Sequence, residues 1–289
     1  MRKPEKTTKS TGKTPRRTYH NTDHTFAVCA YGESPYLEAC LRSLKNQSVP
    51  SGILIATSTP NDHISALAEK YGLPLHIRTT EAVGIAADWN FALRCAPAPL
   101  VTLAHQDDLY HRNYTEDVLA ALNTCRHPLI AFTDYQECRG KKTVTANCLL
   151  KIKRLMLFPL RFRPLRGSRF LRRRILSFGN AICCPSVTFV RENLTAFAFR
   201  NNMKSNIDWQ AWEELSRRKG AFAYVPKPCM EHRIHHASTT SELLEADARK
   251  QEDLQVLRRF WPVPLAAVIE HFYQKSEKSN QLTEAKRSR

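Results

Sequence analysis

The 289-residue chain contains no apolar run approaching the roughly 18 residues that a membrane-spanning helix requires. It also lacks a secretory signal, because residues 1–17 are rich in Lys, Arg and Thr and no hydrophobic stretch follows them. These absences predict a cytosolic protein. We expect residues 1–22 to form a basic, disordered tail.

Metal-binding cysteine patterns are absent as well. The chain has nine cysteines, an odd number, and only Cys183 and Cys184 lie close together in the sequence. Adjacent cysteines are poorly placed to form a disulfide with each other or to chelate one metal ion. The pattern therefore indicates reduced, mostly buried thiols in a reducing compartment and implies no zinc site.

Acidic residues are comparatively few, with 27 Asp and Glu against 44 Lys and Arg, which leaves a formal net charge of +17. A basic surface attracts nucleic acid, anionic lipid or phosphorylated substrates. The chain contains no zinc knuckle, no RNP-like aromatic motif and no helix-turn-helix spacing. A nucleic-acid-binding function is therefore supported by charge alone, and we rank it well below an enzymatic one.

What the first half does contain is a regular alternation of apolar runs. Five runs are typical of buried strands: 25–30, 53–57, 75–78, 100–104 and 129–133. Segments with helical spacing lie between or beside them, at 36–44, 64–71, 86–93 and 118–122. Asn61 or Asp62 is placed to cap the second of these helices. Strands and helices in this order predict an α/β fold with right-handed βαβ units and a mostly parallel, Rossmann-like sheet flanked by helices.

The alternation ends after Asp134. Residues 137–180 are basic and irregular, with helical spacing near 150–157 and 166–177. An amphipathic helix is expected at 208–218, followed by a strand at 221–225 and a polar loop rich in His. Two more helices, broken at Trp261–Pro262, are expected between about 241 and 276.

Two adjacent carboxylates, Asp107 and Asp108, follow the fourth expected strand. Ligands bind at the carboxyl ends of strands in a parallel α/β sheet, and neighbouring carboxylates repel each other unless a cation or a donor group lies between them. Mg²⁺ or Mn²⁺ suits such a pair, because it takes oxygen ligands and bridges phosphate oxygens. A solvated turn or a helix cap is nevertheless the commoner explanation of an isolated Asp-Asp pair, so the pair alone does not identify a site.

Several segments, in one order, resemble those of family 2 glycosyltransferases. Residues 26–47 (FAVCAYGESPYLEACLRSLKNQ) resemble the family's opening strand, Tyr-containing turn and Leu-x-Ser-Leu-x-x-Gln helix. Residues 84–90 (GIAADWN) look like its Gly-x-x-x-x-x-Asn segment, and Leu100–Asp108 falls where it carries metal-binding aspartates. Residues 179–186 (GNAICCPS) resemble the family's segment that lines the acceptor side of the site. Ile207-Asp208-Trp209 resembles the segment of the catalytic base, and 232–238 (HRIHHAS) the Arg-x-His-x-x-Ser loop. The resemblance covers residues 25–240.

This resemblance implies a GT-A fold over residues 23–240. A nucleotide-sugar-binding half is expected at 23–135 and an acceptor-binding half at 136–240, with a basic segment at 151–174. A C-terminal helical extension would occupy 241–289.

The implied activity is that of an inverting, metal-assisted, hexosyltransferase-type enzyme. It would transfer a sugar from a nucleoside-diphosphate sugar, expected to be a UDP-sugar, to a saccharide or lipid-linked acceptor in cell-surface polysaccharide synthesis. By analogy with the family, metal ligands are expected at Asp108, Asp107 and His105, with Mg²⁺ or Mn²⁺ as the ion. Donor contacts are expected from Tyr31, Glu33, Thr57, Ser58, Asn90, Asp107, Arg233 and His235.

Two departures from the family pattern affect the expected site. The family has an Asp after the second strand that binds the nucleotide base, whereas this chain has Thr57 and Ser58 there, whose hydroxyls can replace some of those hydrogen bonds. His105 occupies the first position of the family's Asp-x-Asp motif. His105 can complete a metal shell, contact a phosphate, or simply pack at the end of the strand. A degenerate glycosyltransferase retained as a binding protein is therefore a second hypothesis.

Asp208 is the expected catalytic base, because it opens a helix and matches the family's position. Displacing a nucleoside diphosphate requires a base for the acceptor hydroxyl and charge stabilisation on the leaving group. One base and one hydroxyl nucleophile imply single displacement with inversion. A helix N-terminus stabilises a carboxylate, so the Asp208 pKa should rise only if the side chain is buried. The alternative role of Asp208 is that of a helix N-cap.

Arg233, His235 and His236 could neutralise the departing diphosphate, in a loop that could close over the donor. The alternative is an exposed loop without function. For Asn90 and its neighbour Trp89, a structural role on an amphipathic helix is the stronger reading.

The basic segment 151–174 interleaves ten Lys or Arg residues with aromatic and aliphatic ones. That composition suits peripheral contact with an anionic membrane, here the inner face of the plasma membrane, and a lipid-linked acceptor would fit such a location. RNA binding predicts the same composition, and a solvated helical face is the third interpretation.

Overall fold

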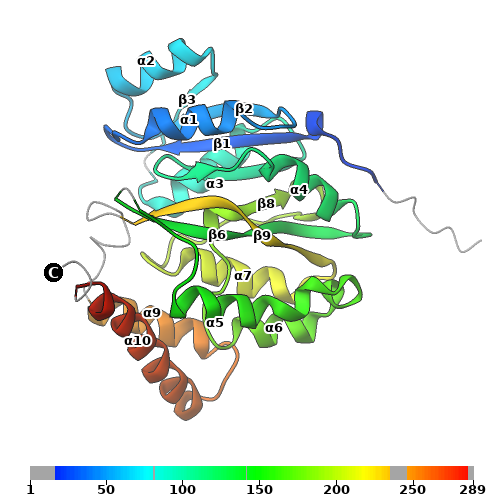
Figure 1. Ribbon diagram of the computed structural model, residues 1–289, viewed down its shortest axis with the longest axis vertical. Coiled ribbons are helices and arrows are strands. Elements are labelled where there is room, and N and C mark those ends of the chain that lie inside the picture. The colour runs from blue at the N-terminus through cyan, green and yellow to red at the C-terminus, as the bar shows by residue number, and fades with distance from the viewer. Residues whose placement is uncertain (1–16, 81, 141, 235–245, 286–289) are drawn as a thin grey trace, which may run out of the picture.

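A computed structural model of the chain describes residues 17–80, 82–140, 142–234 and 246–285 (Figure 1). Within these residues, one nine-stranded sheet runs through the molecule, and helices cover both of its faces. The α/β class with helices flanking a Rossmann-like sheet is therefore confirmed. Helix α2 lies at one end of the molecule, and the helices of the C-terminal half gather at the other (Figure 1).

The first half forms four parallel strands in the order β3-β2-β1-β4. The strands are β1 (His24–Ala30), β2 (Gly52–Thr57), β3 (Leu75–Ile77) and β4 (Leu100–His105). The helices between them are α1 (Leu37–Lys45), α2 (Asp62–Tyr71) and α3 (Ile85–Cys95). All seven elements match the periodicity of the sequence. The predicted cap of α2 is Asn61, whose side chain accepts a hydrogen bond from the Ile64 amide at 2.9 Å.

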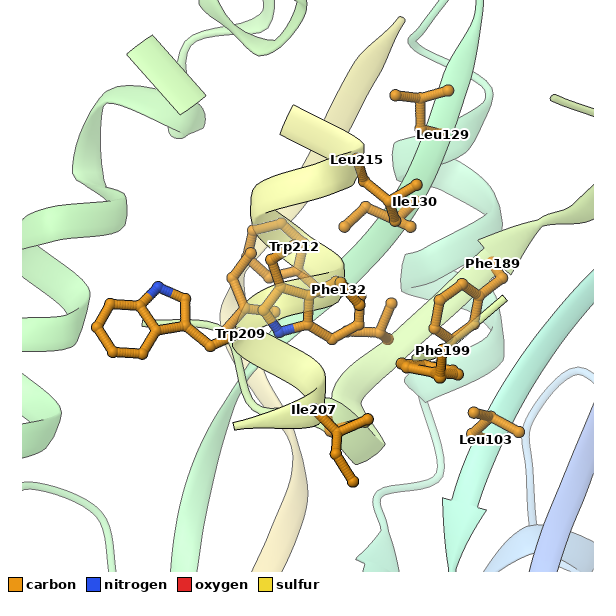
Figure 2. Close-up of a cluster of buried hydrophobic side chains, with 14 of the residues drawn as sticks. Leu103, Leu129, Ile130, Phe132, Phe189, Phe199, Ile207, Trp209, Trp212 and Leu215 are labelled. Atoms are coloured by element: carbon orange, nitrogen blue, oxygen red, sulfur yellow. The ribbon is translucent and has the colours of Figure 1, made fainter. Parts of the chain in front are cut away.

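Alternation along the strands divides the core into two layers, because successive side chains of a strand point to opposite faces. Phe26 and Val28 of β1 pack with α1, α2 and α4 (Tyr114–Leu122) on one face. Ala27 packs on the other face with α3, α6 (Arg169–Leu176), α7 (Ile207–Arg217) and α9 (Ala246–Leu257). On this second face Trp212 of α7 stacks on Phe189 and lies near Phe199, whereas Trp209 points away from that group (Figure 2).

The second half continues the same sheet with both strand directions. Two long strands, β6 (Pro128–Arg139) and β9 (Ala221–Ile234), pair in parallel, and β8 (Val187–Val190) joins β4 to β6 with antiparallel pairing on both sides. The short strands β5 (Leu109–Tyr110) and β7 (Lys142–Val144) add antiparallel pairs to β9 and β6. The boundary expected at residue 135 falls inside β6, so the two halves share one sheet.

Two expectations for this half were wrong. The chain does not become irregular after Asp134 but continues as strand to Arg139, and the expected His-rich loop is strand as far as Ile234. The polar ends of β6 and β9 pair with each other in register from Gln136–Glu231 to Arg139–Ile234. Backbone hydrogen bonds between the two strands stabilise these segments. Their side chains are largely polar and lack the hydrophobic periodicity that marks a half-buried strand, so the sequence did not predict them as strands.

The remaining helices lie beyond this part of the sheet. They are α5 (Cys148–Leu157), α10 (Val263–Ala285) and the α6, α7 and α9 already named, and α5 and α6 match the helical spacing of the basic segment. Short 3-10 helices occupy Asn21–Asp23, Phe158–Arg161, Arg163–Gly167, Cys184–Ser186 and Arg191–Asn193. In the part of the chain that the structure describes, no helix is both long and apolar enough to cross a membrane.

Part of the expected N-terminal tail belongs to the fold. Tyr19 is buried, and its amide donates to Asn123 Oδ1 at 2.8 Å while its hydroxyl donates to Glu192 at 2.6 Å. The tail prediction was therefore wrong for residues 17–22, and residues 1–16 lie outside the described residues. All nine cysteines are free thiols, five of them buried, as their spacing indicated.

Candidate active site

The carboxyl end of β4 carries a buried, fully bonded carboxylate. Asp108 is 1% exposed, accepts a hydrogen bond from the Arg233 amide at 2.9 Å, and faces His232 Nδ1 at 3.1 Å. The short strand β5 produces this contact, because Leu109 and Tyr110 pair with Glu231 and Met230 of β9. The pairing brings the Asp-Asp turn against a segment more than 120 residues later in the chain.

Asp108 and His232 stabilise each other's charged forms. Burial alone would raise the pKa of Asp108, but the facing His232 and the Arg233 amide outweigh it and hold that pKa below its usual value. Burial would likewise lower the pKa of His232, yet the Asp108 carboxylate raises it. The two side chains therefore form an ion pair in the site, with the Asp108 side chain buried and the His232 side chain 29% exposed.

Asp107 is held on two sides. Its Oδ1 accepts a hydrogen bond from Ser34 Oγ at 2.8 Å, and its carbonyl accepts one from Arg233 Nε at 2.9 Å. The Arg233 guanidinium also lies over the Tyr36 ring, 4.4 Å from the centroid. Arg233 thus connects the Asp-Asp turn to the segment between β1 and α1, and it presents a cation beside the two carboxylates.

The turn after β1 is tied to the same region. The Tyr31 amide donates to Gln106 Oε1 at 3.0 Å, and Gln106 Nε2 donates back to the Tyr31 carbonyl at 2.9 Å. Gly32, with a φ of +59°, donates its amide to Thr59 Oγ1 at 2.7 Å. The Tyr31 ring is 65% exposed and Glu33 is also exposed. Tyr31 and Glu33, two of the expected donor contacts, therefore lie at the solvent-exposed edge of the site.

The position expected to bind the nucleotide base is only partly available. Thr57 is buried, and its hydroxyl accepts a hydrogen bond from the Thr59 amide at 3.0 Å. Ser58 is half-buried. Thr59, which the sequence comparison did not single out, carries the hydroxyl that anchors Gly32.

Arg78, at the end of β3, is a residue that the sequence analysis missed. Its side chain is 5% exposed and forms an ion pair with Asp88 of α3 at 3.0 Å. It lines a cavity of about 190 Å³ together with Thr80, Asn90 and Arg94. A lone Arg after a three-residue strand gives no pattern, so only its position at the strand end could have drawn attention to it.

Asn90 performs a structural task. Its amide nitrogen donates to the Phe199 carbonyl and its amide oxygen accepts from the Phe199 amide, both at 2.8 Å. The neighbouring Trp89 packs between Phe199 and His105. The structural reading of these two residues is supported, although Asn90 also borders the cavity at Arg78.

His105 ends β4 with its ring stacked on Trp89, the ring centroids 5.3 Å apart. Its Nε2 is buried and has no hydrogen-bond partner among the described residues. Burial lowers the pKa of His105, which keeps the imidazole neutral. A neutral ring nitrogen without a partner remains free to accept or donate a bond to a ligand.

The expected metal ligands do not form a preassembled shell. Within the described ranges, no three His, Cys, Asp or Glu side chains group closely enough to hold an ion. The carboxylate of Asp108 is bonded to His232 and Arg233, whereas that of Asp107 is less buried. The donor set still fits Mg²⁺ or Mn²⁺, because these ions are commonly held by one or two carboxylates together with substrate phosphates.

Asp208 lies in the first turn of α7, as expected. Asn180 Nδ2 donates to its Oδ2 at 2.8 Å, and the Trp209 amide donates to its Oδ1 at 2.7 Å. Burial nevertheless raises the pKa of Asp208, the one condition under which the sequence analysis allowed a rise. The charges of both Asp208 and Asp108 raise the pKa of the Cys183 and Cys184 thiols beyond the effect of burial, so the two carboxylates lie near one segment.

The basic segment 151–174 is only partly a solvated face. Arg166 is buried and donates to the carbonyls of Leu160 and Tyr224 at 3.0 and 2.9 Å. Arg172 is also buried, with its guanidinium 4.7 Å from the Phe222 ring centroid. Other residues of the segment face outward: Lys151, Arg161, Arg163, Arg169, Arg174, Leu155, Phe158, Phe162 and Phe170. His235 and His236 lie outside the described residues.

Comparison with known proteins places this geometry in context. The family model described as "Glycosyl transferase family 2" matches residues 25–196, more than half of the chain. No curated protein matches the chain significantly.

Among solved structures, S. aureus TarS 1-349 in complex with UDP-GlcNAc is similar, with a TM-score of 0.63 at 15% identity over 89% of this chain and 73% of that one. The mannosyltransferase PcManGT from Pyrobaculum calidifontis, in complex with GDP-Man and Mn²⁺, has a TM-score of 0.59 at 16% identity over 90% and 72% of the two chains. Glucosyl-3-phosphoglycerate synthase from Mycobacterium tuberculosis, in complex with phosphoglyceric acid, has a TM-score of 0.56 at 17% identity over 83% and 80%. At these identities the likeness concerns the fold.

Proposed function

Because the chain belongs to glycosyl transferase family 2 and has the GT-A fold, we propose that it is an inverting enzyme using a nucleoside-diphosphate sugar. The observation that carries this proposal is the convergence of Asp107, Asp108 and Arg233 at the end of β4. Carboxylates beside a fixed cation suit a ligand that contains both ribose hydroxyls and a diphosphate.

Arg233 is the proposed partner of the departing diphosphate. Its guanidinium is held in place by the Asp107 carbonyl and the Tyr36 ring, so no reorientation is needed as charge develops on the leaving group. Asp107 would contact the donor with its partly exposed carboxylate, while Tyr31, Glu33 and Ser58 border the donor at the open edge. Arg78 is a further donor contact that we add to the expected set.

Asp208 is the proposed base. Burial brings its pKa closer to neutral pH, where a general base is most effective. The acceptor hydroxyl transfers its proton to Asp208, and the oxygen attacks the anomeric carbon of the donor. The bond between that carbon and the diphosphate oxygen breaks, and its electron pair leaves with the nucleoside diphosphate. One displacement on the face opposite the leaving group inverts the configuration.

Mg²⁺ or Mn²⁺ is the proposed cofactor, and the PcManGT structure is a complex with GDP-Man and Mn²⁺. Asp107 would hold the ion together with donor phosphates, with Asp108 and His105 as the other candidate ligands. The bound ion would supply positive charge for the leaving diphosphate.

A UDP-sugar is the proposed donor, supported by the UDP-GlcNAc in the TarS structure, although the GDP-Man in PcManGT keeps the base open to test. The proposed acceptor is a saccharide or lipid-linked sugar in cell-surface polysaccharide synthesis, with hexose as the transferred sugar. We place the enzyme in the cytoplasm, with the outward-facing residues of segment 151–174 in peripheral contact with the plasma membrane.

The test is turnover of a panel of UDP-, GDP- and dTDP-sugars with Mn²⁺, measured as nucleoside diphosphate released. We expect release with one donor class, and we expect Asp208→Asn to lower kcat by about a hundredfold or more. Because Asp208 acts deprotonated, wild-type turnover should rise with pH through its raised pKa. The acid limb should therefore lie above the pH of about 3.9 at which an ordinary aspartate titrates.

Asp62→Asn, on the exposed start of α2, is the matched control and should keep wild-type turnover. Absence of turnover with every donor, or an Asp208→Asn variant as active as wild type, would contradict the enzyme. Donor binding without turnover would instead favour the degenerate, binding-only alternative.

A further inference from the structure

A cavity of about 370 Å³ lies between α5 and α10, beside the candidate base. Its walls are almost entirely apolar or aromatic. Ile152 and Met156 of α5 line one side, and Ile269, Phe272 and Tyr273 of α10 line the other. The same two helices carry exposed apolar side chains at the rim, since Phe272 is 64% and Ile152 39% exposed.

The cavity reaches the catalytic segment through Gly179. This glycine has a φ of +151°, and a Cβ built on it would meet Cε2 of Tyr273 at 2.7 Å. The missing side chain therefore lets the Tyr273 ring pack directly on the backbone next to Asn180. Tyr273 also lies 5.7 Å from Trp209 of α7, centroid to centroid, so α10 closes one wall of the cavity against the element that carries Asp208.

Two polar groups in the cavity have unused capacity. Lys153 donates to the Tyr135 hydroxyl at 3.0 Å, and among the described residues it forms no ion pair with a carboxylate. Asn180 donates through Nδ2 to Asp208, while its Oδ1 is buried with no partner in the described part of the chain. A buried acceptor atom of this kind normally has a hydrogen-bond partner, so a ligand hydroxyl is the expected one.

These groups match three parts of one molecule. Apolar walls on two sides suit a hydrocarbon chain, whose burial contributes about 0.8 kcal/mol per methylene. The cation of Lys153 suits a phosphate, and among the residues that the structure describes no acidic one lines the cavity to compete for it. Asn180, bonded to the base, suits the hydroxyl that is to be deprotonated. A free, neutral saccharide has no hydrocarbon chain to pack against the apolar walls and no phosphate to pair with Lys153.

We propose that this cavity binds the acceptor as an anionic amphiphile, a lipid phosphate whose chain lies between α5 and α10 and whose phosphate contacts Lys153. Asn180 orients the acceptor hydroxyl toward Asp208. The inference rests on the proposed function, because it assigns the acceptor class of the same site. Lys153 is thereby an acceptor-binding residue that the sequence analysis did not identify, and Asn180 gives the expected acceptor-side segment 179–186 a specific contact.

The test is calorimetric titration of the full-length protein with decyl phosphate below its micellar concentration. Decyl maltoside, with the same chain and no charge, and inorganic phosphate are titrated in parallel. We expect decyl phosphate to bind at least about tenfold more tightly than either, because only it uses the walls and Lys153 together.

Three variants resolve the contributions. Lys153→Met should weaken decyl phosphate about tenfold and abolish its advantage over decyl maltoside. Phe272→Asp should weaken both amphiphiles and leave inorganic phosphate unchanged. Val268→Asp is the control for Phe272→Asp, because Val268 is 52% exposed on the same helix, α10, and does not line the cavity. It should bind decyl phosphate and hydrolyse donor as wild type does.

Equal binding of inorganic phosphate and decyl phosphate, or an unchanged Phe272→Asp variant, would overturn the inference. The two proposals can fail separately. A protein that turns over a nucleotide sugar but ignores decyl phosphate refutes the lipid acceptor alone. A protein that captures decyl phosphate through Lys153 but turns over no nucleotide sugar refutes the enzymatic proposal.

Discussion

At the scale of single residues, the ion pair of Asp108 and His232 links stability to pH in two directions. The lowered pKa of Asp108 contributes stability that is complete above the unfolded value and lost as pH falls through the folded one. The raised pKa of His232 contributes stability that is complete below the unfolded value and lost as pH rises through the folded one. Both contributions are therefore present together between about pH 4 and about pH 6.5.

We predict that His232→Leu lowers the free energy of unfolding most within that window, by about 2 kcal/mol, because it leaves the buried Asp108 with only the Arg233 amide. Urea unfolding at several pH values measures this difference. The exposed His127 supplies the control variant, His127→Leu, which should show no such maximum. A loss for His232→Leu that is the same at pH 5 and pH 8.5 would contradict the coupling.

At the scale of elements, α9 supports the helix that carries the base. The Glu252 carboxylate accepts hydrogen bonds from the amides of Lys204, Ser205 and Asn206 at 2.7, 2.8 and 3.0 Å. Burial opposes the charge, but these donors hold the pKa of Glu252 below its usual value. The turn that they fix leads directly into α7, so the start of that helix is set by a residue 44 positions after Asp208.

Glu252→Gln should therefore disturb α7 without touching the donor. We expect a loss of about 1 kcal/mol in stability, because the charge-assisted bonds become neutral ones, and a lower kcat with an unchanged KM for the donor. Thermal unfolding and steady-state kinetics measure the two effects. Gln255→Ala, at an exposed position of the same helix, is the control. A raised donor KM with normal kcat would contradict this prediction, because it would mean that α9 affects donor binding rather than the position of α7.

Elements differed in how far the sequence predicted them. Strands β1, β2 and β4 were predicted because their apolar runs are largely buried, and the more exposed β3 because its short apolar run continues the alternation with amphipathic helices. The far ends of β6 and β9 were not, because their largely polar side chains give no hydrophobic period.

The residues of the candidate site were likewise predicted where a local sequence pattern marks them, and their long-range contacts were not. Asp107, Asp108 and Asp208 were found through local patterns that resemble the family. Their contacts with Ser34, His232 and Asn180 depend on long-range pairing, above all on the two-residue strand β5, which is too short to leave a pattern. Lys153 stood in a cluster of ten basic residues, and composition alone cannot separate the one that lines a cavity from those in solvent.

At the scale of the whole molecule, the outward-facing residues of segment 151–174 predict salt-dependent membrane binding. We expect the protein to sediment with vesicles containing anionic lipid at low salt, to remain in solution with zwitterionic vesicles, and to be released as salt screens the charge. Replacing Leu155, Phe162 and Phe170 together by Ser should weaken sedimentation, since these side chains are 74%, 52% and 73% exposed. Equal sedimentation with both kinds of vesicle would contradict an electrostatic contact.

The contact between Asp108 and Arg233 also has a consequence for synthesis. It joins residues 125 positions apart, so the ribosome must release β9 before the site exists. A nascent chain that has completed β1 to β4 already contains the four parallel strands but carries Asp108 without its ion-pair partner His232. A nucleotide-sugar donor can therefore stabilise the folded state only late in translation, after β9 has been synthesised. Truncated chains that end before β9 should fold in part but should not bind a nucleotide sugar.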